Sequence, residues 1–101
     1  MEKISPLRKK IDEIDEQILH FLKERVEICK TIGAAKREHG IPIRDRQREE
    51  EQYRYVVRRA SELKLDPQEV KAIYREIIAM GVHAQESYST KSCSNGNSSS
   101  S

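Results

Sequence analysis

The chain has 101 residues, of which 36% are charged, and its formal net charge is +2. This length indicates a single domain, and the near balance of charge excludes a strongly basic surface for binding nucleic acid. The sequence contains no apolar run long enough to cross a membrane and no signal peptide, and its two cysteines do not suggest a disulfide framework. We therefore expect a reduced, cytoplasmic protein.

The first predicted element is a long helix with one apolar stripe. It would begin with Ser5 as the N-cap and Pro6 at the first helical position, and it would end near His39, with Gly40 as the stop signal. Roughly 34 residues at about 1.5 Å each give a rod of about 50 Å. The apolar positions recur every three or four residues, as in a helix with one buried face: Ile4, Leu7, Ile11, Ile14, Ile18, Phe21, Ile28, Ile32 and Ala35.

Arg25 occupies the stripe position between Phe21 and Ile28, where an apolar residue is expected. A guanidinium group stays charged in proteins and is costly to bury without a partner. Two explanations remain open at this point. Either the long side chain reaches water or a carboxylate of the protein, or a ligand anion binds it.

Two shorter helices follow in the prediction. Asp45 is the expected N-cap of the second helix, which would run to about Leu63. Asp66 is the expected N-cap of the third helix, with Pro67 at its first position. Each of the two helices also carries a polar residue in its apolar stripe, so charged or polar groups interrupt all three stripes: Glu49 and Gln85.

These elements predict an all-α domain over residues 1–88, built from one long and two shorter helices. Residues 89–101 are Ser-rich and nearly devoid of apolar side chains, which predicts a disordered tail. Because a rod of about 50 Å outreaches two shorter helices, the ends of its apolar stripe would stay exposed in a monomer. We therefore predict an antiparallel, intertwined homodimer, with a parallel coiled coil of the first helices as the alternative.

The polar stripe residues can be combined into one site. Lys36 lies eleven residues after Arg25, so their side chains point within roughly 20° of each other, about 16 Å apart along the helix. Arg8 lies about 25 Å from Arg25 along the axis and would reach the same site only from a partner chain. Arginines bind carboxylates by paired hydrogen bonds, so the site suits a small dianion with a hydroxyl group. The other helices would complete it with Arg48, Glu49 and Gln85.

No cofactor or metal is expected at this site. The sequence contains no nucleophile paired with a base, no cluster of residues at metal-ligand spacing and no Gly-rich phosphate loop. The predicted partners are therefore a small-molecule substrate and a second copy of the chain, with no nucleic acid and no membrane.

The order and spacing of these residues resemble those of the AroQ-type, all-helical chorismate mutases. The similarity spans about residues 4–88 without a gap. The opening LR..ID..D pattern is a weak signal by itself, whereas the ordered set of Arg, Arg, Lys, Asp-x-x-Arg-Glu and Gln at these separations is highly specific. The matching segments are Leu7 to Asp15, Lys23 to Arg25, Gly33 to Lys36, Ile41 to Glu49, and Ile77-Ile78 followed by Gln85.

The resemblance implies an isomerase that rearranges chorismate to prephenate, in the biosynthesis of phenylalanine and tyrosine. It implies an intertwined dimer with two active sites, each using both chains. Arg25 and Arg8 of the partner subunit would bind the two substrate carboxylates, and Lys36 and Gln85 would donate to the ether oxygen. Such a rearrangement is unimolecular and needs no covalent intermediate, so the protein would act by restraining the substrate and by stabilising charge on the ether oxygen.

The resemblance also assigns the remaining site residues. Glu49 would hold the ring hydroxyl, helped by Arg48 and by the backbone near Asp45, although Asp45 has an equally good reading as a helix cap. Near the carboxylate site, some relatives carry a small polar residue where this chain has Gly81, whose backbone N–H could serve instead.

Two alternative functions are compatible with parts of this pattern. An isochorismate–pyruvate lyase has a similar chain and acts on an isomer with its hydroxyl elsewhere on the ring; Glu49 favours chorismate over that isomer. A non-catalytic helical dimerisation protein would use the polar stripe residues only to set the register of the dimer. That reading leaves the convergence of Arg25, Lys36 and Gln85 unexplained.

Overall fold

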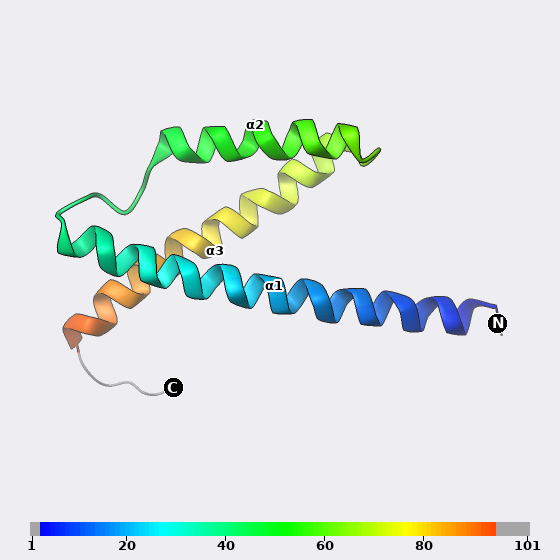
Figure 1. Cartoon of the computed structure of the whole chain (residues 1–101), viewed down its shortest axis with the longest axis horizontal. Helices are drawn as coiled ribbons and strands as arrows, with labels where there is room; N and C mark the ends of the chain where they lie inside the picture. Colours follow the sequence, from blue (N-terminus) through cyan, green and yellow to red (C-terminus); the bar gives the residue numbers. More distant parts are fainter. Residues whose placement is uncertain (1–2, 95–101) are drawn as a thin grey trace.

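The chain folds into three helices, α1 (Ile4–Glu38), α2 (Arg46–Glu62) and α3 (Pro67–Ser94) (Figure 1). The structure, a computed structural model, describes the backbone of residues 3–94 and the side chains of residues 3–86. Within that part of the chain no strand occurs. The prediction of an all-α fold with one long and two shorter helices is therefore confirmed.

The predicted N-cap of α1 is wrong by two residues. Lys3, not Ser5, is the N-cap, and no side chain caps this end. Ser5 and Pro6 lie inside the first turn, where backbone N–H groups have no intrahelical acceptor, so the missing N–H of Pro6 costs no hydrogen bond. A cap at Ser5 was therefore not needed for Pro6 to be accommodated.

The ends of α1 and α2 are closed by the same backbone arrangement. Gly40 follows α1 with a φ of 66°, and the N–H of Ile41 returns to the carbonyl of Lys36 at 2.8 Å. After α2, Lys64 takes the left-handed conformation with a φ of 64°, and the N–H of Leu65 reaches the carbonyl of Ala60 at 2.8 Å. This left-handed cap favours glycine, so the predicted stop at Gly40 is confirmed, and Lys64 adopts the same conformation at a steric cost.

Both predicted aspartate caps are confirmed. The Asp45 carboxylate accepts a hydrogen bond from the backbone N–H of Arg48 at 3.0 Å. The Asp66 carboxylate accepts one from the N–H of Gln68 at 2.9 Å and one from that of Glu69 at 3.3 Å. Each cap satisfies donors that the first turn of a helix leaves unpaired.

α3 is the central element of the arrangement. Both α1 and α2 pack against α3, while α1 and α2 make no close backbone contact with each other in the described residues. Figure 1 shows α3 running obliquely between the other two helices and crossing the C-terminal half of α1. At this crossing Gly33, the buried residue of α1, lies directly against Gln85. The C-terminal half of α1 is therefore fixed in place, and the N-terminal half projects freely.

One chain buries only a small core. The buried apolar residues of the described part are Val56, Ala60, Ile78, Val82 and Ala84. The radius of gyration is 17.3 Å, against about 13 Å for a compact domain of about 100 residues. The principal extents of 53 × 33 × 15 Å describe a thin, open layer of helices.

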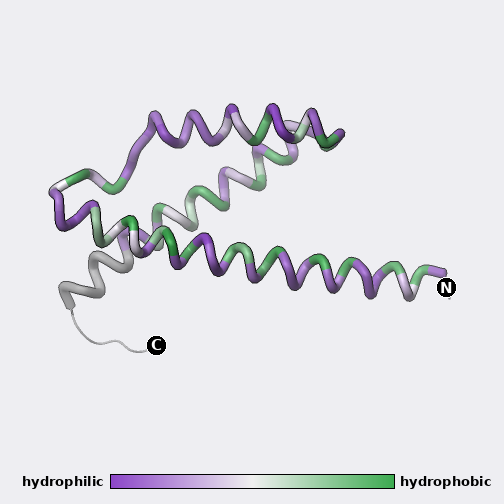
Figure 2. Tube along the Cα trace, viewed as in Figure 1, coloured by the Kyte–Doolittle hydropathy of each residue, from purple (hydrophilic) through white to green (hydrophobic). Residues whose placement is uncertain are grey.

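The N-terminal half of α1 carries a stripe of exposed apolar side chains. Figure 2 shows apolar positions recurring along α1 beyond the reach of the other helices. Five of these side chains are between 41% and 58% exposed: Ile4, Leu7, Ile11, Ile14 and Ile18. The predicted helical period is thus confirmed, but none of the other described helices covers this stripe.

The predicted boundary at residue 88 and the disordered tail stay predictions. The α3 backbone continues to Ser94, and residues 95–101 lie outside the described residues. Among the described helices, none combines the length and apolar character needed to span a membrane.

Candidate active site

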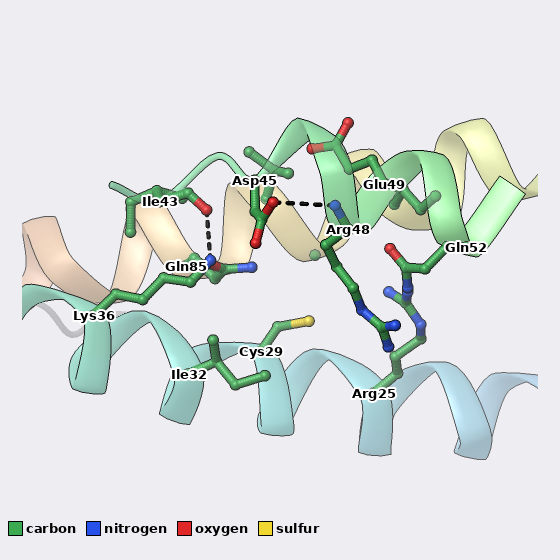
Figure 3. A pocket seen from close by; sticks show the side chains of 13 residues that line it. Arg25, Cys29, Ile32, Lys36, Ile43, Asp45, Arg48, Glu49, Gln52 and Gln85 are labelled. Atoms are coloured by element: carbon green, nitrogen blue, oxygen red, sulfur yellow. Dashed lines mark hydrogen bonds between the residues drawn. The ribbon is translucent and has the colours of Figure 1, made fainter. Parts of the chain in front are cut away.

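A cavity of about 360 Å³ lies where the C-terminal half of α1, the start of α2 and the middle of α3 meet (Figure 3). Its size is within the usual range for small-molecule sites. Seven of the eight residues proposed from the sequence line it: Arg25, Lys36, Asp45, Arg48, Glu49, Gly81 and Gln85. The helical spacing of α1 and the polar stripe positions of α2 and α3 therefore bring these residues to one cavity.

Lys36 is held at one end of the cavity by two hydrogen bonds. Its ammonium group donates to the carbonyl of Ile43 at 2.6 Å and to Oε1 of Gln85 at 3.0 Å. The first contact joins α1 to the connection before α2, and the second joins α1 to α3. An ammonium group has three N–H donors, so one remains for a ligand.

Gln85 is oriented by the same contact. Because its Oε1 accepts from Lys36, its amide nitrogen is left as a donor. Figure 3 shows this nitrogen pointing from Lys36 toward the interior of the cavity. The pair Lys36–Gln85 thus offers N–H donors to one region of the cavity.

Arg25 has no carboxylate partner among the described side chains. Its Nη1 donates to the backbone carbonyl of Ile77 at 3.3 Å, and none of the ion pairs of residues 3–86 includes it. The side chain is partly buried. The sequence left open a carboxylate of the protein as the partner of Arg25. No such partner occurs among the described side chains of the same chain.

The first turn of α2 brings Asp45 and Arg48 to the cavity. The carboxylate of Asp45 caps the helix through the Arg48 N–H, so the structural reading of Asp45 is correct. The guanidinium group of Arg48 makes one long, solvent-exposed contact of 3.6 Å with Glu51, which contributes little. Figure 3 shows this group extending toward Arg25, so two guanidinium groups face the same region.

Glu49 is the buried charged residue of the described part of the chain, with 9% of its surface exposed. Arg44 donates to both of its oxygens, from Nε at 2.6 Å and from Nη2 at 2.8 Å. Hydrogen bonding to the Arg44 guanidinium lowers the pKa of Glu49 below its ordinary value, against the opposing effect of burial. Figure 3 shows the carboxylate pointing away from the guanidinium groups of Arg25 and Arg48.

Gly81 is buried at the α3 wall of the cavity. A β-carbon added there would lie 3.0 Å from Sγ of Cys29 and 3.2 Å from Nη1 of Arg25. Both distances are shorter than ordinary van der Waals contacts. A side chain at this position would therefore need Cys29 or Arg25 to move.

Several lining residues were missed by the sequence reasoning. Cys29 and Ile32 follow Arg25 by four and seven residues on α1, and Gln52 follows Arg48 by four residues on α2. The helical rule that places Lys36 beside Arg25 also places these residues on the same faces, so their positions were predictable. Arg44 does not line the cavity but binds Glu49. It was missed because it lies in the connection before α2, where no helical period applies.

Arg8 is the predicted site residue that the single chain does not bring to the cavity. It lies in the projecting N-terminal half of α1 and is exposed.

No group of three or more His, Cys, Asp or Glu side chains in the described residues is arranged to hold a metal ion. Arg25, Lys36 and Arg48 line the cavity, and the negative charge of Glu49 is balanced by Arg44. The net charge that the cavity presents to a ligand is therefore positive.

The sequence of the chain matches a family model described as chorismate mutase type II over residues 7–86. The chain belongs to this family. The match includes α2, most of α1 and most of α3. Every site residue named above lies within it.

Individual relatives agree with the family. The chain is 43% identical over 82 residues to a bifunctional chorismate mutase/prephenate dehydratase of Aquifex aeolicus, covering 78% of this chain and 23% of that protein. It is 34% identical over 88 residues to a chorismate mutase of Methanocaldococcus jannaschii, covering 87% of this chain and 89% of that one. The chain thus spans about a quarter of the first relative and most of the second.

A solved structure shares the fold. A conserved hypothetical protein from Pyrococcus furiosus superposes with a TM-score of 0.67 at 40% sequence identity, covering 84% of this chain and 97% of that chain. This likeness supports the arrangement of the three helices.

Proposed function

We propose that this protein converts chorismate to prephenate, a step toward phenylalanine and tyrosine. The observation that carries the proposal is the pairing of Lys36 with Gln85, opposite an arginine that lacks a carboxylate partner in the described residues. The family to which the chain belongs supports the same reaction. The rearrangement breaks one C–O bond and forms one C–C bond within a single molecule, so it requires restraint and charge stabilisation and no nucleophile.

The ether oxygen of the substrate would lie between Lys36 and Gln85. The free N–H of the Lys36 ammonium group and the Gln85 amide nitrogen would both donate to it. Negative charge grows on this oxygen as the C–O bond breaks. Donors fixed beforehand by Ile43 and by each other stabilise the transition state more than the substrate.

The substrate carboxylates would bind the arginines. Arg25 would bind one carboxylate, with Arg48 extending toward the same region. The second substrate carboxylate needs another arginine, and Arg8 of the partner subunit would supply it. Glu49 would accept a hydrogen bond from the ring hydroxyl, with the backbone near Asp45 as a further contact.

The homodimer required by this arrangement is supported by the uncovered face of α1. Five apolar side chains in a row along α1 are 41% to 58% exposed, and a contiguous exposed apolar patch often marks a protein–protein interface. The described residues bury only a small core. A second copy in antiparallel, intertwined orientation would cover this face and would carry its Arg8 toward the cavity. A second cavity of about 420 Å³ shares Arg25 and Arg48 with the first and is also lined by Tyr55 and Tyr74. This cavity could admit the Arg8 side chain of the partner subunit.

The first test is incubation of the purified protein with chorismate and identification of the product. Prephenate supports the proposal. Inertness toward chorismate, with salicylate and pyruvate formed from isochorismate, would instead assign a lyase. Inertness toward both in a folded dimer would mean that the polar stripe residues serve assembly.

Mixing two inactive variants tests whether the site is shared between chains. Arg8→Ala and Arg25→Ala should each lose turnover alone. After the two are unfolded and refolded together, about a quarter of the wild-type activity should return, because half of randomly assembled dimers are mixed and each has one complete site. No recovery would place both arginines of each site in one chain.

A further inference from the structure

The pairing of Arg44 with Glu49 is not accounted for by the substrate contacts proposed above. The two N–H···O distances of 2.6 and 2.8 Å join Nε and Nη2 to the two carboxylate oxygens. Such a two-point contact fixes the direction of a carboxylate as well as its place. Arg44 comes from the connection between α1 and α2, so the contact also fixes that connection against the first turn of α2.

The two partners differ sharply in burial. The Glu49 side chain is enclosed, whereas 46% of the Arg44 side chain is exposed. Ion pairs with an exposed partner generally contribute little to stability. What this pair does provide is control over a buried carboxylate at the wall of the cavity.

The carboxylate keeps capacity for a further donor. Each of its oxygens has two lone pairs, and Arg44 uses one on each. The remaining lone pairs are available to a hydroxyl group. A carboxylate held at two points in this way loses little further freedom when such a hydroxyl binds.

We propose that Arg44 is a positioning residue of this site: it holds the Glu49 carboxylate directed away from Arg25 and Arg48 (Figure 3), as the acceptor for the substrate hydroxyl and apart from the arginines that would bind the substrate carboxylates. This inference rests on the proposed function. Arg44 itself does not line the cavity and acts only through Glu49.

The charges around the pair act in the same direction. Lys36 from α1 and Arg46 from α2 join Arg44 in lowering the pKa of Glu49, and burial opposes them. Glu86 from α3 and Tyr53 from α2 act on Arg44 and raise its pKa, as does Glu49 itself. Removal of Arg44 takes away the largest of the effects that keep Glu49 ionised, so the pKa of Glu49 should rise.

The test compares Arg44→Gln, Arg44→Lys and Arg46→Gln with the wild-type protein. Arg46→Gln is the matched control, because it removes a neighbouring positive charge that acts on Glu49 without a hydrogen bond. For each protein, kcat and KM for chorismate are measured between pH 4 and 8, and circular dichroism verifies folding.

We expect Arg44→Gln to lower kcat/KM by about 10- to 100-fold, the scale of a misplaced contact, and to move the acid limb of the profile to higher pH. Arg44→Lys should recover part of the loss, because an ammonium group keeps the charge but not the two-point contact. Arg46→Gln should stay within about threefold of wild type, as for an exposed charge.

Wild-type kcat/KM and an unmoved acid limb in Arg44→Gln would overturn the inference and leave the proposed function standing. A higher kcat/KM in this variant would also overturn it, because Arg44 would then hold Glu49 away from the substrate. A wild-type protein inert toward chorismate would overturn the proposed function and this inference with it. A ¹³C NMR titration of the Glu49 carboxyl carbon tests the action of Arg44 on Glu49 without measuring turnover. An equal Glu49 pKa in wild type and Arg44→Gln would overturn the inference.

Discussion

Replacement of Gly33 by alanine should damage both the fold and the site, although alanine is the better helix former. A β-carbon at this position would lie 2.7 Å from Cα and 2.8 Å from the carbonyl oxygen of Gln85. Carbon atoms in contact are normally about 3.5–4.0 Å apart, so α1 and α3 would have to separate locally by about 1 Å. The atoms in the way belong to the backbone, and no side-chain rotation can relieve the contact.

The expected cost follows from two opposing terms. Overpacking of a tight contact costs about 1–3 kcal/mol, and the upper end applies here because the clash is with backbone. The change from glycine to alanine within a helix returns about 1 kcal/mol. Gly33→Ala should therefore reduce the free energy of unfolding by about 2 kcal/mol. Displacement of Gln85 from Lys36 should also lower kcat by about 100-fold.

Urea unfolding followed by circular dichroism at one protein concentration measures the first effect. Ala72→Gly is the control, because this exposed position on α3 reports the exchange of alanine for glycine without a tight contact and should cost about 1 kcal/mol. If Gly33→Ala is as stable as the wild-type protein or more so, the reasoning from the crossing of α1 and α3 is refuted.

Four further predictions follow from single contacts. Lys36→Ala should lower kcat far more than it raises KM, because the lysine contact with the ether oxygen strengthens in the transition state; equal effects on both would contradict the electrostatic role. Lys64→Gly should raise the free energy of unfolding by about 0.5–1 kcal/mol, since it removes the steric cost of a left-handed residue, and an unchanged urea midpoint would contradict this. Asp45→Ala should cost about 1 kcal/mol of stability through the lost cap, whereas Asp45→Asn, which keeps an acceptor oxygen, should cost only a few tenths; equal losses in the two variants would show that the cap is not the cause. Because Arg44 lowers the pKa of Glu49 from its ordinary value of 4.5, the ionised carboxylate stabilises the fold above this pH, and the contribution is lost as the pH falls through the lowered value; acid unfolding of Arg44→Gln should therefore begin at higher pH than that of the wild type, and coincident acid transitions would argue against the pair.

Local signals along the chain were enough to predict the three helices and most of the site residues. The three- and four-residue apolar period, the caps at Asp45 and Asp66 and the stop at Gly40 are local signals. They act within one or two turns, so they can be read along the chain. The position of Lys36 relative to Arg25 follows from the same periodicity, and both residues line the cavity.

The contacts between elements could not be predicted from the sequence. The pairing of Arg44 with Glu49, the contact of Gly33 with Gln85 and the left-handed Lys64 carry no periodic signal. Such contacts depend on the angles at which α1 and α2 meet α3 and on the path of the connection between α1 and α2. These angles arise from the packing of side chains distant in sequence. For this reason the sequence could name the residues of the site, but not which of their hydrogen bonds the protein itself already uses.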